Sequence, residues 1–94
     1  MHALIDRHRD EILDLAARHG ATNVRVFGSF ARGEARQDSD LDLLVDMEPG
    51  RSLIDTIQLI QELGRLLGRK VDVLTEPALY WMVRRRILAE AKPL

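Results

Sequence analysis

The first notable absence in this sequence is cysteine. None of its 94 residues is a cysteine, which excludes disulfide bonds and thiolate metal sites. No apolar run approaches the length of a membrane span, and the charged stretch from Asp6 to Glu11 is unlike a signal peptide. These absences fit a cytoplasmic protein that has no contact with a membrane.

Aromatic residues and an excess of one charge are also lacking. Phe27, Phe30, Tyr80 and Trp81 are the four aromatic residues, too few for a platform on which bases could stack. The formal net charge is −1, so no basic excess attracts a nucleic acid or an anionic membrane. The composition therefore disfavours nucleic acid as a partner.

What is present is the composition of a small globular protein. Hydrophobic residues make up 46% of the chain and charged residues 31%, both usual for such proteins. A chain of 94 residues has room for one modest core. We expect a single domain over residues 1–94.

Hydrophobic periodicity predicts an α/β fold with the element order α-β-α-β-α-β-α. Helices are expected over residues 3–19, 29–33, 53–67 and 75–91, and strands over residues 24–27, 40–45 and 70–74. Ser52 and Asp55 resemble a capping box at the start of the third helix. Helices would then pack on a small sheet.

A glycine and a serine separate the first expected strand from the short helix that follows it. Glycine allows a close approach of the backbone, and the amides of Gly28 and Ser29, together with the serine hydroxyl, suit a phosphate group. The same dipeptide is also a routine turn and helix cap. Both interpretations stay open on this dipeptide alone.

Two aspartates, Asp40 and Asp42, stand two residues apart on the second expected strand. Residues i and i+2 of a strand share a face, so the carboxylates would lie side by side and repel each other unless a cation is bound. Mg²⁺ is the natural guest, since it takes oxygen ligands from carboxylates and from substrate phosphates. The alternative is a solvated strand face, although aspartate is a poor strand former.

A third carboxylate, Asp72, lies between two valines on the third expected strand. If that strand neighbours the second one, Asp40, Asp42 and Asp72 converge on one face of the sheet. This arrangement is typical of sites that hold two metal ions about 3.5–4 Å apart.

Two groups of basic residues remain open to two interpretations. Arg32 and Arg36 follow the Gly-Ser turn, where they either neutralise phosphate charge or belong to a solvated loop. Trp81 lies near three consecutive arginines, Arg84, Arg85 and Arg86, which suits either an interface anchor or a solvated helix face.

Two further predictions concern the last helix and the histidines. The apolar stripe Tyr80, Val83, Ile87 and Ala91 is expected to face the core. His2, His8 and His19 show no ligand spacing, so we assign them no metal role.

The Gly-Ser pair, the ten-residue interval and the Asp-x-Asp motif together resemble the nucleotidyltransferase superfamily that includes DNA polymerase β. The continuation Ala31-Arg32-Gly33 and the small size resemble its minimal branch, the MNT domain proteins, many of which are antitoxins of HEPN toxins. The resemblance implies a small mixed sheet flanked by helices, as in the polymerase β palm. It also implies that Gly28, Ser29 and Arg32 bind the nucleotide and that Asp40, Asp42 and Asp72 are catalytic and bind two Mg²⁺ ions.

The activity implied by the resemblance is transfer of AMP from ATP to a hydroxyl, expected to be a tyrosine, of a partner HEPN toxin. Asp72 would activate that hydroxyl. One alternative is an antitoxin without catalysis that neutralises its toxin by occlusion, and another is transfer to a small molecule or an RNA end. A domain this small would also be suited to pair with itself or with the toxin.

Overall fold

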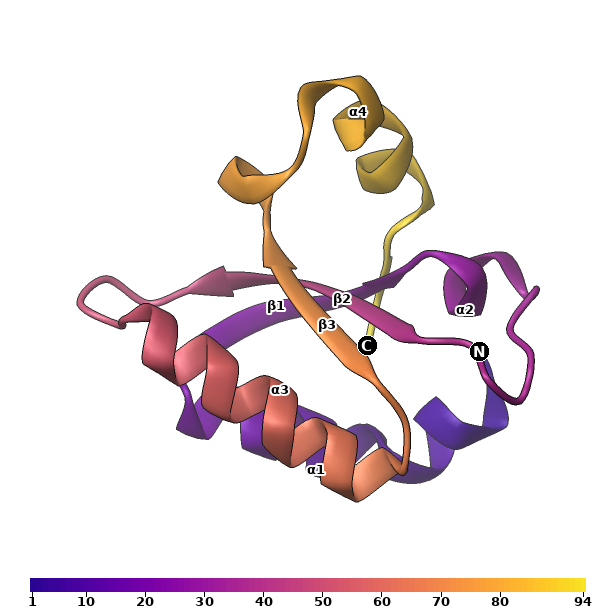
Figure 1. The fold of residues 1–94 in the computed structure, drawn as a ribbon, viewed down its shortest axis with the longest axis horizontal. Coiled ribbons are helices and arrows are strands. Elements are labelled where there is room, and N and C mark those ends of the chain that lie inside the picture. Colours follow the sequence, from indigo (N-terminus) through magenta and orange to yellow (C-terminus); the bar gives the residue numbers. More distant parts are fainter.

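The computed structural model describes all residues from 1 to 94 and contains one four-stranded sheet with helices on both faces (Figure 1). The elements in chain order are α1 (Ala3–Arg18), β1 (Ala21–Phe27), α2 (Ser29–Arg32), β2 (Leu41–Met47), α3 (Leu53–Leu67), β3 (Val71–Thr75), the 3₁₀ turn η1 (Glu76–Ala78), α4 (Trp81–Glu90) and β4 (Lys92–Pro93). The strand order in the sheet is β3-β2-β1-β4. The β2–β3 pair is parallel, whereas β1 runs antiparallel to both β2 and β4.

Helix α3 provides the crossover that a parallel strand pair requires. At its start the Ser52 N–H donates to the Asp55 carboxylate at 3.0 Å, and this hydrogen bond lowers the pKa of Asp55. At its end Gly68 adopts the left-handed conformation with φ +66°, which glycine reaches without strain. Both signals are local, so the helix bounds agree with the sequence expectation.

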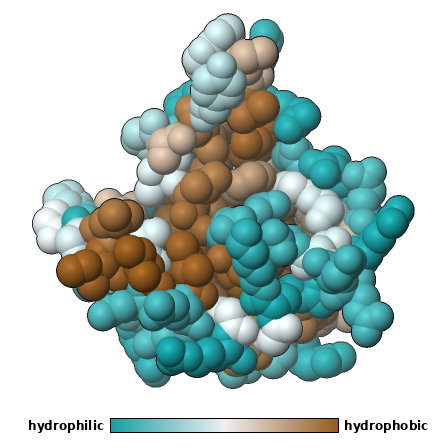
Figure 2. All heavy atoms as spheres, in the orientation of Figure 1, coloured by the Kyte–Doolittle hydropathy of each residue, from teal (hydrophilic) through white to brown (hydrophobic).

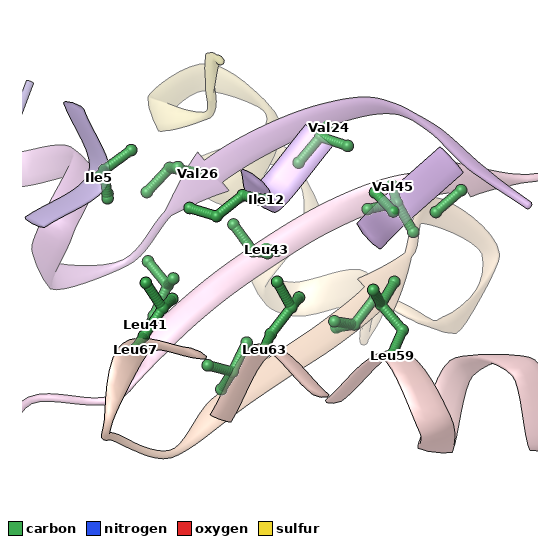
Figure 3. Packing of buried hydrophobic residues seen from close by; sticks show 14 of the residues in the cluster. Ile5, Ile12, Val24, Val26, Leu41, Leu43, Val45, Leu59, Leu63 and Leu67 are labelled. Carbon is green, nitrogen blue, oxygen red and sulfur yellow. The ribbon is translucent and has the colours of Figure 1, made fainter. Parts of the chain in front are cut away.

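The main core lies between the sheet and the two long helices, α1 and α3. Its largest side chains come from α1, from the inner faces of β1 and β2, and from α3; Figure 3 labels Ile5, Ile12, Val24, Val26, Leu41, Leu43, Val45, Leu59, Leu63 and Leu67. Because side chains alternate along a strand, burial of Leu41 and Leu43 turns Asp42 to the opposite face.

A second, smaller cluster lies on that opposite face, under α4. It consists of Phe27, Leu44, Leu79 and Ile87. In Figure 1, α4 stands on the side of the sheet away from α1 and α3. The face that carries the aspartates is therefore partly roofed by α4.

Two expectations about the last helix need correction, and one strand was not expected. The last helix begins at Trp81 instead of residue 75, because Leu79 is extended and buried and so interrupts the helix. Tyr80 precedes that helix and is 61% exposed, so it does not belong to the core. Strand β4 was not expected, since two residues that include a proline give no periodic signal.

Strand β1 also begins earlier than expected, at Ala21.

None of the helices is both long enough and apolar enough to cross a bilayer.

The importance of the main core can be tested with Leu63→Ala. Leu63 is fully buried, and truncation of such a side chain removes buried area and leaves a cavity, at a cost of about 2–5 kcal/mol. Chemical denaturation should show this loss, whereas Ile54→Ala on the same helix, which removes an exposed side chain, should change stability by less than about 0.5 kcal/mol. Equal losses in the two variants would contradict this assignment of the core.

Candidate functional site

The turn between β1 and α2 lies directly against Asp42 of β2. Gly28 has φ +73°, a conformation that disfavours any side chain, and a Cβ at this position would collide with Oδ2 of Asp42. The antiparallel register explains this contact, because Phe27 and Asp42 are partners in the β1–β2 pair. Gly28 is therefore required both by its backbone angle and by the neighbouring carboxylate.

The short helix α2 turns the chain away from the sheet immediately after Gly28. The Gly28 carbonyl accepts hydrogen bonds from the backbone N–H groups of Ala31 and Arg32, both at 3.1 Å. Phe30 and Ala31 are buried under this turn, and the Arg69 guanidinium stacks over the Phe30 ring at 5.1 Å. The buried Phe30 and Ala31 thus hold the turn against the core, while Ser29 and Arg32 line a pocket.

Asp42 and Asp72 lie on two neighbouring strands, and Asp40 directly precedes the first of them. Asp42 and Asp72 are partners in the parallel β2–β3 register, so their side chains share a face of the sheet. Asp40 stands just before β2, two residues from Asp42, and Lys70 Nζ lies 3.8 Å from its Oδ2. The predicted adjacency of the two strands is confirmed.

Asp42 is the carboxyl group that this arrangement disfavours most when it is ionised. Partial burial, followed by the negative charges of Asp72 and Asp40, raises its pKa above the ordinary value of 3.8. Arg32 opposes the shift, and Glu90 adds to it. An uncompensated group of carboxylates of this kind favours the binding of a cation.

A pocket of about 370 Å³ brings the turn and the aspartates together. Its polar lining consists of Gly28, Ser29, Arg32, Ser39, Asp40, Asp42, Arg86 and Glu90. Asp72 does not line this pocket; it lies beside Asp42, on the neighbouring strand β3. Five of the six predicted site residues therefore meet in one cavity.

Glu90 and Arg86, from the far end of the chain, are the site residues that sequence reasoning missed. Glu90 Oε2 accepts from the Gly28 N–H at 3.0 Å and from Arg32 Nη1 at 2.8 Å. Arg32 Nε also donates to Glu34 at 2.7 Å. The only available signal was the position of Glu90 near the end of a helix, which does not reveal the element that the helix covers.

The donor set has the chemistry that a magnesium site needs, although the side chains are not gathered into a closed cage. No group of three or more acidic or histidine side chains is close enough together to hold a metal ion. Mg²⁺ usually uses only one or two protein carboxylates and takes its other ligands from water and phosphates. Asp40 and Asp42, with the Gly28 turn beside them in the pocket, fit that pattern.

The other polar residues considered above lie outside the pocket. The Arg36 N–H donates to Ser39 Oγ at 2.7 Å, within the loop before β2. His2 accepts from the Leu4 N–H at the start of α1, and His19 pairs with Glu62 at 2.8 Å between α1 and α3. Trp81, at the start of α4, is 75% exposed.

Comparison with known protein families agrees with this geometry. The family model of the nucleotidyltransferase domain matches residues 5–94. The chain is 39% identical to "Putative protein adenylyltransferase MJ0435" of Methanocaldococcus jannaschii, over 93% of this chain and 94% of that protein. It is 37% identical to protein adenylyltransferase MntA of Thermococcus cleftensis, over 96% of this chain and 88% of that protein.

Solved structures show the same fold. A structure described as a "putative minimal nucleotidyltransferase" superposes with a TM-score of 0.85 and 53% identity, covering 96% of this chain and 92% of that one. A tri-AMPylated HEPN toxin in complex with its MNT antitoxin, from Shewanella oneidensis, matches with a TM-score of 0.70, covering 94% of this chain and 69% of that one. At 18% identity the second likeness shows the fold alone.

The electrostatic strain at Asp42 predicts a stability effect. With a raised pKa, this carboxyl contributes stability below its unfolded pKa and loses that contribution as the pH rises through the folded value. At pH 7, with a chelator present to remove cations, Asp42→Asn should therefore raise the melting temperature above that of the wild type by about 1–4 °C. The gain should shrink as the pH falls toward 4.

Asp46→Asn is the matched control for that measurement. Asp46 lies on the same strand but pairs with Arg25 at 3.2 Å, so its removal should not stabilise the protein. Thermal unfolding followed by circular dichroism from pH 4 to 7 provides the comparison. A lower melting temperature for Asp42→Asn than for the wild type at pH 7 would contradict the electrostatic interpretation.

Proposed function

The chain belongs to the nucleotidyltransferase domain family, and on that basis we propose that it is a Mg²⁺-dependent protein adenylyltransferase that transfers AMP from ATP to a partner protein. The observation that carries the proposal is the shared pocket of Gly28, Ser29, Asp40 and Asp42. Groups that can donate hydrogen bonds to a phosphate lie next to carboxylates in this pocket, because the antiparallel β1–β2 register pairs Phe27 with Asp42. The names of the relatives above, protein adenylyltransferases, support the choice of reaction.

In this proposal the turn binds the triphosphate. The Gly28 N–H, the Ser29 hydroxyl and the Arg32 guanidinium donate to phosphate oxygens, and charge-assisted bonds of this kind are stronger than neutral ones. Asp40 and Asp42, which line the pocket, would bind Mg²⁺ there, and Asp72 on the neighbouring strand would be the third carboxylate for a pair of ions. When bound, these ions would neutralise the triphosphate and the departing pyrophosphate.

The acceptor hydroxyl then attacks the α-phosphorus in line with the leaving group. Asp72 takes the proton of that hydroxyl, a bond forms between its oxygen and the α-phosphorus, and the bond from the α-phosphorus to the bridging oxygen breaks. Pyrophosphate leaves with the bonding electrons. Most of the rate enhancement comes from positioning and charge neutralisation, as is usual for phosphoryl-group chemistry.

The partner that we propose is a HEPN toxin, and the acceptor is a tyrosine of that toxin. This chain would then act as the antitoxin. The Shewanella complex of an AMPylated HEPN toxin with its MNT antitoxin supports this choice through a shared fold. A related complex crystallised with AMP-PNP supports ATP as the nucleotide.

A second function, neutralisation by occlusion without catalysis, is favoured by one observation. Asp72, the third predicted carboxylate, does not line the pocket that Asp40 and Asp42 share. In that case the domain would only cover the toxin. The experiments below separate the two functions.

Removal of either pocket carboxylate should strongly reduce transfer. With labelled ATP, Mg²⁺ and the partner toxin, Asp40→Asn or Asp42→Asn should lower the rate of label transfer by about 100-fold or more. Asp46→Asn, on the same strand but outside the pocket, should transfer label at the wild-type rate. Equal labelling by Asp40→Asn and the wild type would sink the enzymatic proposal.

Neutralisation in cells provides the second comparison. The double variant Asp40→Asn, Asp42→Asn should fail to protect cells from the toxin if catalysis neutralises it. Full protection by this variant would favour occlusion. Immunoblots should show equal levels of the variant and wild-type chains.

The exposed aromatic residue at the start of α4 should contribute to binding of the partner. Trp81→Ala removes a side chain that is largely accessible and should weaken binding by about 10-fold or more if Trp81 is an interface anchor. Leu53→Ala, which removes an exposed apolar side chain from α3, is the matched control. Unchanged affinity of the Trp81 variant, measured by calorimetry, would assign this residue to an ordinary solvated surface.

A further inference from the structure

One carboxylate, that of Glu90, occupies the donors that the proposed phosphate site offers. Glu90 is the last residue of α4, and its side chain is only 14% exposed. A single oxygen, Oε2, accepts from both the Gly28 N–H at 3.0 Å and Arg32 Nη1 at 2.8 Å. These two donors come from Gly28, in the turn before α2, and from Arg32, the last residue of α2, and both are more than fifty residues away in the sequence.

A carboxylate oxygen and a phosphate oxygen accept hydrogen bonds from the same kinds of donor. Both are anionic acceptors, and both form short charge-assisted bonds with a guanidinium group and a backbone amide. While Glu90 holds this position, a phosphate oxygen cannot take the same two hydrogen bonds. The negative charge of Glu90 also adds to the charges of Asp40 and Asp42 in the same pocket, so it repels an approaching triphosphate.

A second position for the Glu90 side chain is available on its own helix. Arg86 stands one turn earlier on α4, and its Nε lies 3.9 Å from Oε1 of Glu90. Residues four apart on a helix are neighbours, so Glu90 can pair fully with Arg86 after it leaves the turn. Arg86 also lines the pocket, which keeps this exchange local.

We propose that Glu90 competes with the nucleotide for the phosphate cradle, by which we mean the Gly28 N–H and Arg32 Nη1. The Glu90 carboxylate occupies this cradle in the free protein, and ATP must displace it on binding. The inference rests on the proposed function, since it assigns the Gly28 and Arg32 donors to the triphosphate. Displacement of Glu90 breaks the side-chain link between the end of α4 and the turn. Nucleotide binding is therefore coupled to α4, the helix whose first residue is the exposed Trp81.

The coupling has a consequence for selectivity. A ligand must offer more favourable contacts than the Glu90 carboxylate before it can occupy the cradle, because the two compete for the same donors. A triphosphate with its cation offers several such contacts, and a single phosphate offers fewer. Glu90 therefore disfavours the binding of anions that make few contacts, relative to the binding of a nucleotide.

The test is the affinity for ATP of the Glu90→Gln variant. Glutamine retains the length of the side chain and an acceptor oxygen but carries no charge, so it should yield the cradle more easily. Calorimetry with the non-hydrolysable analogue AMP-PNP and Mg²⁺ should show binding that is about 3- to 10-fold tighter than in the wild type. Weaker or unchanged binding by Glu90→Gln, with binding by the wild type intact, would overturn the inference and leave the proposed function standing.

Glu34→Gln is the matched control. Glu34 also pairs with Arg32, at 2.7 Å, but its carboxylate makes no hydrogen bond to the Gly28 N–H. Loss of this charge should change the affinity by less than about twofold. Equal tightening in the two variants would reduce the effect to general charge and overturn the role of the cradle.

A direct measurement on the wild-type protein covers the case in which Glu90→Gln does not fold. In NMR titrations with AMP-PNP and Mg²⁺, the Gly28 amide and the Glu90 side-chain carboxyl carbon should shift together, in the same concentration range. A Glu90 carboxyl that keeps its free-state shift at saturation would contradict displacement. Absence of any binding by the wild type would overturn the nucleotide assignment itself, and the inference with it.

Discussion

The close contact between the Gly28 backbone and the Asp42 carboxylate is the constraint on which the site depends. It arises because β1 and β2 are antiparallel and their register pairs Phe27 with Asp42. A side chain at residue 28 would collide with that carboxylate, so the turn and the acidic strand can only meet at a glycine. This one contact converts two separate sequence motifs into one pocket.

The opposite faces of β2 divide the work between stability and chemistry. Leu41 and Leu43 are buried against α1 and α3 in the main core, which holds the strand rigidly in place. Asp42 points to the other face, where burial and neighbouring carboxylates raise its pKa. The core therefore supplies the free energy that offsets the repulsion among the aspartates. Exposed hydrophobic residues of α3, Leu53, Ile54 and Ile57, also gather over the start of that helix on the face shown in Figure 2, away from the hydrophilic side at the right.

Helix α4 links the site to the outer surface of the molecule. Its inner side packs Ile87 on the small cluster with Leu44, and its last residue, Glu90, bonds to the turn. Its first residue, Trp81, is exposed. The pocket and the exposed Trp81 therefore lie at the two ends of the same short helix.

Local patterns in the sequence were sufficient for the helix α3, the order of the first six elements and the face on which Asp40 and Asp42 lie. Each of these depends on periodicity, a cap or a turn residue, and those signals act over a few neighbouring residues. The start of α4 was misjudged because burial of Leu79 against a distant strand overrides local helix preference. Strand β4 and the role of Glu90 gave no local signal, since both depend on contacts with β1 and the following turn. Only the tertiary structure decided which carboxylate occupies the cradle, because that choice is made between residues that lie sixty-two positions apart in the chain.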